Sequence, residues 1–318
     1  MTISVGERVF EFSSQTQGNE MGYGIGIDLG GTNIKISAVS EEGLTLSRAT
    51  HETQADSPAS WIATIKSAIQ EIEEAQHSRA SWIGLAAPGL ADKDNLAIAN
   101  MPGKLRGLEG LNWTNALEAT DPVPVLNDAH AAMMGEVWIG AAAGYRDVVL
   151  LTLGTGVGGA ILANGQLLKG HTGRAGHLGH LSLDPNGPAD IVGTPGSLEL
   201  SIGNSTVAAR TGGRFTSTRQ LVEAHLNGDH DATEIWLRSV KHLAAGITSI
   251  INAVDPELIV IGGGIAKAGP ALFEPLANFL DQIEWRPLGH RVRIVPAALD
   301  DFAGTIGAVY YAISRTRG

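Results

Sequence analysis

The chain has 318 residues, with 33 acidic and 22 basic side chains, a formal net charge of −11 and no cysteine. This length predicts about two domains of roughly 150 residues each. The acidic balance argues against a broad nucleic-acid surface, and the lack of cysteine excludes disulfides, thiolate zinc sites and thiol nucleophiles. Without a membrane-length apolar run or a visible signal peptide, we expect a cytoplasmic protein.

Alternating apolar strands and amphipathic helices indicate an α/β architecture. Residues 1–21 form an N-terminal extension that looks polar and irregular. Beyond it, the pattern predicts four main strands, at Tyr23–Ile27, Trp82–Ala86, Asp147–Leu153 and Leu258–Ile261. It predicts helices, the first one capped by Ser57, at Pro58–Ala75, Ala129–Trp138, Lys241–Val254 and Ala303–Ser314.

Two β-hairpins resemble one another. Gly24–Ser37 contains an apolar strand, a glycine-rich turn and a second strand. Val148–Leu162 repeats this order and is followed by Asn164-Gly165, a favourable hairpin dipeptide. The similarity predicts a duplicated fold whose halves face one another.

Three glycine-rich turns follow apolar strands. The turn Asp28–Asn33 offers backbone N–H groups to a phosphate, with Lys35 in the next strand, although a tight hairpin with positive φ would also explain it. The turn Gly154–Gly159 matches the dinucleotide fingerprint, but a strand follows instead of a helix, which leaves a phosphate-binding hairpin. At Gly262–Gly264 the backbone is open to a flat ring or a ribose, or else packs closely in a strand-to-helix turn.

In order and spacing, these motifs resemble the ROK family of sugar kinases, from about Gly24 to the C-terminus. The resemblance rests on Asp28-x-Gly-Gly-Thr, Asn127-Asp128-Ala129, Leu153-Gly-Thr-Gly-Val-Gly-Gly, Ala175–His180, Ile261-Gly-Gly-Gly-Ile and Asp300-Asp-Phe-Ala-Gly. It implies an actin/hexokinase-like fold, a duplicated ribonuclease H-like α/β fold of two lobes with a cleft between them. The N-terminal lobe would comprise residues 22–126 with the C-terminal helix 301–318, and the C-terminal lobe residues 127–300. A homodimer is implied as well.

The resemblance also implies that the chain binds ATP with Mg²⁺. Asp28 would hold the metal, through water. The residues expected to contact the nucleotide and its metal are Asp28, Gly30, Gly31, Thr32, Asn33, Lys35, Gly154, Thr155, Gly156, Gly262, Gly263 and Gly264.

Phosphorylation of a sugar needs a carboxylate that accepts the hydroxyl proton. Asn127-Asp128 lies where a strand gives way to a helix, a position that also suits a helix N-cap. The aspartate that matches Asp128 is the catalytic base in the family. By the same resemblance, the sugar-binding residues would be Ala87, Gly89, Asn100, Asn127, His177, His180 and Glu199. Without the resemblance, the sequence would also be consistent with a structural role for His180 and with a solvent-exposed helix position for Glu199.

The chain departs from the family at its zinc site, which most members build from one histidine and three cysteines. Asp190, Val192 and Ser197 occupy the three cysteine positions, while His180 is kept. Valine cannot bind zinc, and His180 with Asp190 falls short of four ligands. We therefore expect no zinc, and a loop held by hydrogen bonds from Asp190 and Ser197.

A second departure places His177 where the family has a glutamate. A carboxylate accepts two sugar hydroxyls and a neutral imidazole only one, so the preferred sugar is open. The simplest expectation is phosphorylation of glucose to glucose 6-phosphate. Fructose, mannose, N-acetylmannosamine and N-acetylglucosamine are alternative substrates, and polyphosphate is a donor that the acidic charge disfavours.

Two other classes of protein compete with a kinase. A sugar-sensing repressor would carry a DNA-reading domain, but only 27 residues precede Asp28 and they are not basic. A catalytically inactive sugar-binding protein is suggested by His177 and the lost zinc site. The presence of Asp28 and Asp128 argues for the enzyme.

Overall fold

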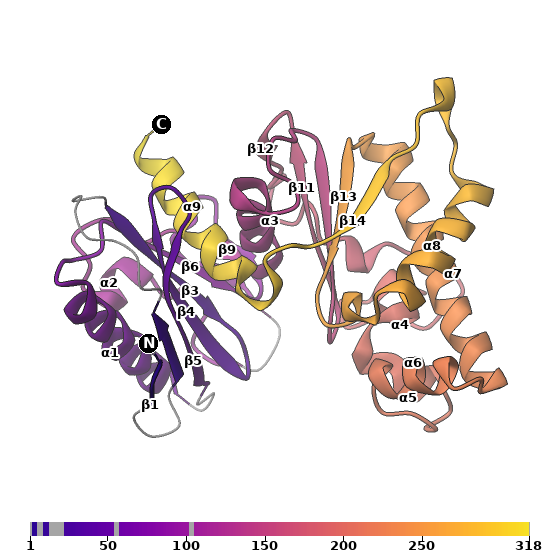
Figure 1. The fold of residues 1–318 in the computed structure, drawn as a ribbon, viewed down its shortest axis with the longest axis horizontal. Helices are drawn as coiled ribbons and strands as arrows, with labels where there is room; N and C mark the ends of the chain where they lie inside the picture. The colour runs from indigo at the N-terminus through magenta and orange to yellow at the C-terminus, as the bar shows by residue number, and fades with distance from the viewer. Residues whose placement is uncertain (1, 5–8, 13–21, 54–56, 102–104, 318) are drawn as a thin grey trace. The chain divides into compact units, whose positions relative to one another are not determined.

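A computed structural model describes residues 2–4, 9–12, 22–53, 57–101 and 105–317. The chain divides into two compact units (Figure 1). The first comprises Met1–Ala143, Lys169–Arg174 and Ala298–Gly318, and the second comprises Gly144–Leu168 and Ala175–Ala297. No helix in the described ranges has the length and apolar character needed to cross a membrane.

The first unit contains a seven-stranded sheet in the order β1-β2-β5-β4-β3-β6-β9. Its strands are β1 (Thr2–Ser4), β2 (Val9–Phe12), β3 (Tyr23–Leu29), β4 (Asn33–Ser40), β5 (Thr45–Glu52), β6 (Trp82–Ala87) and β9 (Val125–Asn127). β3, β6 and β9 are mutually parallel neighbours, and the other pairs are antiparallel. A short separate pair is formed by β7 (Leu90–Ala91) and β8 (Ile98–Asn100). In the extension that the sequence predicts to be irregular, the described residues 2–4 and 9–12 are instead strands, since β1 pairs with β2 and β2 pairs with β5; the rest of residues 1–21 lies outside the described residues.

The helices of the first unit are α1 (Pro58–Gln76), α2 (Trp113–Leu117), α3 (Asp128–Ile139), the short 3₁₀ helix η5 (Asp300–Phe302) and α9 (Ala303–Thr316). As predicted, Ser57 caps α1 by accepting the Ala59 amide, and a proline begins the helix. The apolar residues of β3 and β4 form one core with Trp61 and Ile65 of α1.

Side-chain alternation along β3 explains how close α9 lies to the sheet. Ile25 and Ile27 belong to the core shared with α1, whereas the intervening Gly26 carries no side chain. A Cβ on Gly26 would lie 1.9 Å from the Thr305 carbonyl oxygen of α9. Glycine therefore lets the helix backbone approach the strand, and it brings the start of α9 to the end of β3.

Helix α3 packs against α9 with similarly close backbones. A Cβ on Gly307 would lie 1.7 Å from the Ala131 carbonyl oxygen, and one on Gly135 would lie 2.6 Å from that of Ala303. The structure groups α3 with the first unit, whereas the C-terminal lobe expected from the family resemblance comprised residues 127–300 and so included this helix. The glycines of two helices far apart in sequence account for this packing.

The second unit contains a five-stranded sheet in the order β12-β11-β10-β13-β14. Its strands are β10 (Val148–Leu153), β11 (Val157–Ala163), β12 (Gln166–Leu167), β13 (Leu258–Gly262) and β14 (Arg293–Pro296). β10, β13 and β14 are parallel, and β11 is antiparallel to β10 and β12. Asn164 and Gly165, both with positive φ, form the turn before β12 as predicted.

The second unit also contains several helices, of which the longest is α7 (His230–Val254). The others are α4 (Leu198–Ile202), α5 (Val207–Arg210), α6 (Thr218–Leu226), α8 (Pro270–Ile283) and the 3₁₀ turns η1 (Leu178–His180), η2 (Asn204–Thr206), η3 (Ala266–Ala268) and η4 (Pro287–Gly289). α7 begins eleven residues before the predicted Lys241, because Asp229 caps it and Ala232 and Trp236 continue its buried face.

The two sheets share a local topology. The order β4-β3-β6-β9 in one unit matches β11-β10-β13-β14 in the other, since each is an antiparallel hairpin followed by two parallel strands. This match agrees with the duplication predicted from the two hairpins. The α/β class is confirmed.

Candidate active site

The first glycine-rich turn joins β3 to β4. The Gly30 amide donates to the Asn33 carbonyl at 2.9 Å, and Gly31, Thr32 and Asn33 are exposed. Neither glycine has a positive φ, so the tight-hairpin explanation does not account for them. A Cβ on Gly31 would meet no described atom within 4 Å. The turn therefore presents bare backbone, as a phosphate site requires.

Asp28 lies near the end of β3 with its carboxyl beside the first turn of α9, where a Cβ on Gly304 would be 3.0 Å from Oδ2. Burial and then the charge of Asp128 raise the pKa of Asp28 to about 7, and Lys35 opposes this rise. Lys35 Nζ also donates to the Asp301 carbonyl at 3.0 Å. Two interacting carboxylates are a donor set that fits a hydrated divalent cation.

At the N-terminus of α3, Asn127 and Asp128 have different positions, which the sequence alone did not distinguish. Asn127 is the N-cap, with Oδ1 accepting the amides of Ala129 at 3.0 Å and His130 at 3.4 Å. Asp128 is the first residue of the helix, is exposed, and accepts the Ala129 amide at 2.8 Å. The positive end of the helix dipole stabilises its ionised carboxylate. Asp128 thus has the exposure and charge that a base needs.

The predicted sugar-binding residues of the first unit lie close together. Ala87 pairs with Asn127 across β6 and β9, and the Asn127 side-chain amide donates to the Gly89 carbonyl at 2.9 Å. Gly89 has a φ of 102°, and a Cβ there would lie 2.6 Å from the Asn100 carbonyl oxygen. Asn100 is exposed at the end of β8. Four residues from three segments therefore form one neighbourhood.

The second glycine-rich turn joins β10 to β11 and is held by Glu199, the second residue of α4. Glu199 Oε2 accepts the Val157 amide at 2.9 Å, and a Cβ on Gly156 would lie 2.2 Å from that oxygen. The carbonyls of Gly154 and Thr155 accept amides from the segment after α4. Glu199 therefore positions this turn, and its role toward a sugar remains a prediction.

The third turn, after β13, contains glycines of two kinds. Gly263 has a φ of 85°, and a Cβ there would lie 2.4 Å from the Leu153 carbonyl oxygen, so close packing explains it. Gly264 has no positive φ, and a Cβ there would meet no described atom within 4 Å. Gly154 is open in the same way. Packing within the described chain thus gives no reason for the absence of a side chain at Gly154 or Gly264.

A cavity of about 750 Å³ lies at these turns in the second unit. It is lined by the predicted Gly154, Thr155 and Gly264, and also by Asn204, Thr218, Arg219, Val222, Glu223, Leu226, Ile265, Lys267 and Ala268. Thr218 is 4% exposed, and its hydroxyl has no hydrogen-bond partner among the described residues. A buried hydroxyl without a partner is unfavourable until a ligand supplies one. Thr218 could not be identified from the sequence, because no local pattern marks it.

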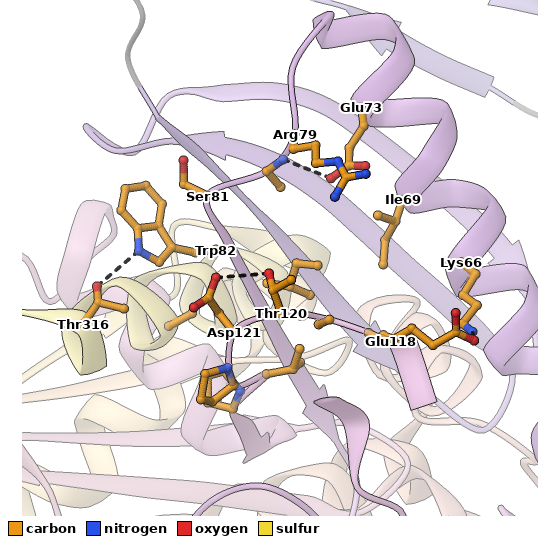
Figure 2. Close-up of a pocket in the computed structure, with 18 of the residues that line it drawn as sticks. Lys66, Ile69, Glu73, Arg79, Ser81, Trp82, Glu118, Thr120, Asp121 and Thr316 are labelled. Carbon is orange, nitrogen blue, oxygen red and sulfur yellow. Dashed lines mark hydrogen bonds and ion pairs between the residues drawn. The ribbon is translucent and has the colours of Figure 1, made fainter. Parts of the chain in front are cut away.

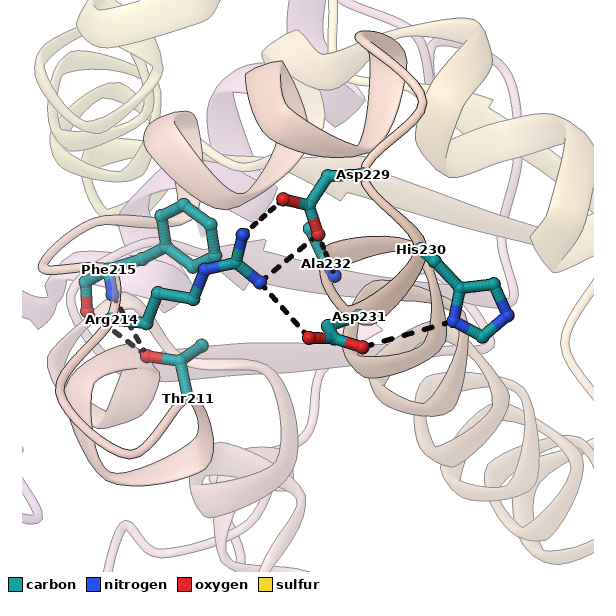
Figure 3. Close-up of polar contacts among 7 residues, drawn as sticks. All are labelled: Thr211, Arg214, Phe215, Asp229, His230, Asp231 and Ala232. Atoms are coloured by element: carbon teal, nitrogen blue, oxygen red, sulfur yellow. Dashed lines mark hydrogen bonds and ion pairs between the residues drawn. The ribbon is translucent and has the colours of Figure 1, made fainter.

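A polar cluster fixes the segment that leads into α6, one wall of this cavity (Figure 3). Arg214 pairs with Asp229 and, at 3.4 Å, with Asp231, and its guanidinium lies 5.1 Å from the centre of the Phe215 ring. Asp229 also caps α7 by accepting the Ala232 amide at 2.9 Å. Hydrogen bonds from the Ala232 amide and from Arg214 lower the pKa of Asp229. The start of α7 therefore anchors the segment before α6.

At the predicted position of the lost zinc site, His180 Nδ1 and Asp190 Oδ2 are 2.7 Å apart. Asp190 Oδ1 accepts the amides of Val192 at 3.0 Å and Thr194 at 2.9 Å. The hydrogen bonding expected of Asp190 is confirmed, whereas the buried Ser197 hydroxyl has no partner among the described residues that meets hydrogen-bond geometry. His177 lies just before η1, three residues from His180. Within the described ranges, no three histidine, aspartate or glutamate side chains are grouped as metal ligands, and the chain has no cysteine.

A second cavity, of about 550 Å³, lies in the first unit between α1, residues 117–124 and the end of α9 (Figure 2). Lys66 Nζ and Glu118 Oε1 form an ion pair of 2.6 Å on its wall, and Trp82 Nε1 donates to Thr316 Oγ1 at 3.2 Å. None of the predicted site residues lines this cavity. It is separate from the candidate active site.

Comparison with known proteins gives consistent matches. The model of the ROK family matches residues 24–315. A glucokinase of Thermotoga maritima is 31% identical over 314 residues, covering 92% of this chain and 98% of that protein. An N-acetylmannosamine kinase of Escherichia fergusonii is 29% identical over 295 residues, covering 91% and 97%. A ROK family glucokinase from Streptomyces griseus, crystallised with glucose and AMPPNP, superposes with a TM-score of 0.76 at 27% identity, covering 92% of this chain and all of that one.

The family match covers all three glycine-rich turns, Asp128 and His180. The similar solved structure confirms the actin/hexokinase-like α/β fold expected from the sequence. By motif, topology and family match together, the chain belongs to the ROK family.

Proposed function

We propose that this protein is an ATP- and Mg²⁺-dependent sugar kinase that phosphorylates glucose on its 6-hydroxyl. The observation that carries the proposal is the set of open glycines at Gly31, Gly154 and Gly264. At each of them neither a positive φ nor a described neighbour explains the missing side chain. A ligand that lies against bare backbone does explain it, and nucleotide phosphates and adenosine are such ligands.

The residues present suit ATP. The exposed turn Gly30–Asn33 and the turn Gly154–Gly156 offer amides to phosphates. The cavity beside Gly264 has room for adenosine, and the buried Thr218 hydroxyl supplies an unused hydrogen-bonding group. When bound, ATP and Mg²⁺ supply the phosphoryl group and the charge that stabilises its transfer. Asp28 and Asp128 would hold the metal's water shell on the protein side.

Asp128 would act as the base. Its exposed carboxylate would accept the proton of the sugar hydroxyl as the hydroxyl oxygen bonds to the terminal phosphorus of ATP and ADP leaves. The α3 N-terminus favours a negative charge at Asp128, and the Asn127 cap fixes the backbone from which it projects. Asn127 also holds the Gly89 carbonyl, which ties the sugar-side loop to the base. The sugar-side loop and the base are therefore held in place before the sugar binds.

The identity of the sugar depends on residues that contact hydroxyls. We assign Asn100, His177, His180 and Glu199 to this role together with the backbone of Ala87 and Gly89. Glucose is the substrate named for the glucokinase relatives, and the similarity to an N-acetylmannosamine kinase makes N-acetylmannosamine the second candidate. Fructose, mannose and N-acetylglucosamine belong in the same assay. A homodimer in the cytoplasm is part of this proposal.

The test measures ADP release with Mg·ATP across these sugars, for the wild type and Asp128→Asn. Loss of a general base lowers kcat by about 10²–10⁴-fold. Asp121→Asn, at an exposed carboxylate in the separate cavity of Figure 2, is the matched control and should keep full activity. ADP binding to Asp128→Asn should persist by calorimetry.

Turnover of Asp128→Asn within tenfold of the wild type would contradict the assignment of the base. An absence of turnover with every sugar would replace the kinase with a sugar-sensing or inactive sugar-binding protein. Fastest turnover with N-acetylmannosamine would keep the reaction and change the substrate.

A further inference from the structure

His180 and Asp190 form a side-chain pair in which Asp190 is buried and His180 is partly exposed. The Asp190 side chain is 0% exposed, while that of His180 is 25% exposed. Nδ1 of His180 meets the buried carboxylate, which leaves Nε2 as the ring nitrogen that this carboxylate does not contact. Among the described residues, Asp190 is the hydrogen-bond partner found for this side chain.

Asp190 is itself held rigidly by its loop. Oδ1 accepts the amides of Val192 and Thr194, and the Asp190 amide donates to the Thr194 carbonyl at 2.9 Å. Burial alone would raise the pKa of Asp190, but the hydrogen bonds from His180 and from these amides lower it. Oδ2 is therefore an ionised acceptor in a fixed place, aimed at Nδ1.

An ionised carboxylate can only accept hydrogen bonds. In a neutral imidazole one nitrogen carries the proton and the other accepts, so a carboxylate at Nδ1 selects the Nδ1–H tautomer. We propose that Asp190 is a positioning residue, which holds His180 with Nε2 unprotonated so that Nε2 accepts a hydrogen bond from a sugar hydroxyl. The sugar-binding half of this inference rests on the proposed function, whereas the tautomer does not.

Asp190→Asn is a selective perturbation of this pair. The asparagine carbonyl can still accept the amides of Val192 and Thr194, so the loop keeps its hydrogen bonds. Its NH₂ group then faces Nδ1 and can only donate, which moves the imidazole proton to Nε2. The variant thereby converts Nε2 from an acceptor into a donor with almost no change of shape.

The direct test is NMR of ¹⁵N-histidine-labelled protein at pH 8.5, without sugar or nucleotide, where histidine side chains are generally neutral. His180→Gln assigns the His180 signals by their loss. We expect a protonated Nδ1 and an unprotonated Nε2 in the wild type, and the reverse in Asp190→Asn. Asp184→Asn, at an exposed carboxylate of the same loop that caps the Asn186 amide, should leave the tautomer unchanged. An Nε2–H tautomer or an imidazolium in the wild type would overturn the proposal.

Kinetics test the consequence for the sugar. Asp190→Asn should raise KM for the preferred sugar about tenfold, the cost of one mismatched hydrogen bond, with kcat and KM for ATP within about twofold. A reversed tautomer with unchanged sugar KM would refute the role in sugar binding. If no sugar is turned over, the proposed function fails and the sugar-binding role fails with it, while the NMR result still decides whether Asp190 sets the tautomer.

Discussion

Substitution of two adjacent glycines after β13 should have opposite effects on stability. Gly264 has open space where a Cβ would be, and its φ is compatible with any L-residue. Gly264→Ala should therefore leave stability unchanged or raise it by about 0.4–1 kcal/mol, by restricting the unfolded chain. Gly263→Ala places a Cβ 2.4 Å from the Leu153 carbonyl at a φ of 85°. It should cost at least about 1–2 kcal/mol for the left-handed backbone, and more for the displaced carbonyl.

The same methyl group at Gly264 would intrude on the nucleotide. It would lie at the wall of the 750 Å³ cavity, and overpacking of this kind would cost about 1–3 kcal/mol of nucleotide-binding free energy. That range corresponds to a rise of roughly 5–150-fold in KM for ATP. Thermal unfolding and steady-state kinetics of both variants provide the measurement, and KM for the sugar serves as the internal control. A Gly264→Ala enzyme with the wild-type KM for ATP would refute the proposal that the nucleotide lies against Gly264. A destabilised Gly264→Ala variant would show that other atoms of the protein occupy the space beside this residue.

Three further perturbations follow from the first unit. The pKa of Asp28 is raised to about 7, so protonation of this carboxyl stabilises the folded state. This stabilisation amounts to about 4 kcal/mol below about pH 4, and it is lost as the pH rises through 7. In urea unfolding without Mg²⁺, Asp28→Asn should therefore gain stability relative to the wild type between pH 5 and pH 8, and a pH-independent difference would contradict this. Gly26→Ala forces a Cβ against the Thr305 carbonyl and should cost at least about 3 kcal/mol, so a variant with wild-type urea midpoint would disprove the close packing of α9. Asn127→Ala removes the N-cap of α3 and should cost about 1–2 kcal/mol of stability, which urea unfolding would measure. It should also raise KM for the sugar, which steady-state kinetics would measure.

The sequence by itself predicted the features that depend on neighbouring residues. Apolar runs located β3, β6, β10 and β13, the Ser57-Pro58 cap located the start of α1, and the turn dipeptide Asn164-Gly165 located a hairpin. Such features depend on local backbone preferences, which a short window of sequence contains. The glycine-rich turns were also identifiable, since glycine marks backbone that other residues would block.

Local patterns could not tell why each glycine is present. Gly156 makes room for Glu199 and Gly263 for the Leu153 carbonyl, whereas Gly154 and Gly264 are open. These reasons lie in atoms from elsewhere in the chain. The short strands β1 and β2 were missed for a similar reason, because pairing with β5 supports them where their own sequence looked irregular.

Tertiary structure alone decided the chemistry of the charged groups. Asp28 and Asp128 are a hundred positions apart, yet the packing of α9 against β3 and α3 brings their charges close enough to interact. Asp190 becomes a buried partner of His180, and Thr218 becomes part of a cavity wall, through contacts with segments distant in the sequence. Propensity and turn chemistry act along the chain, but burial and electrostatics act through space, so only the folded molecule determines them.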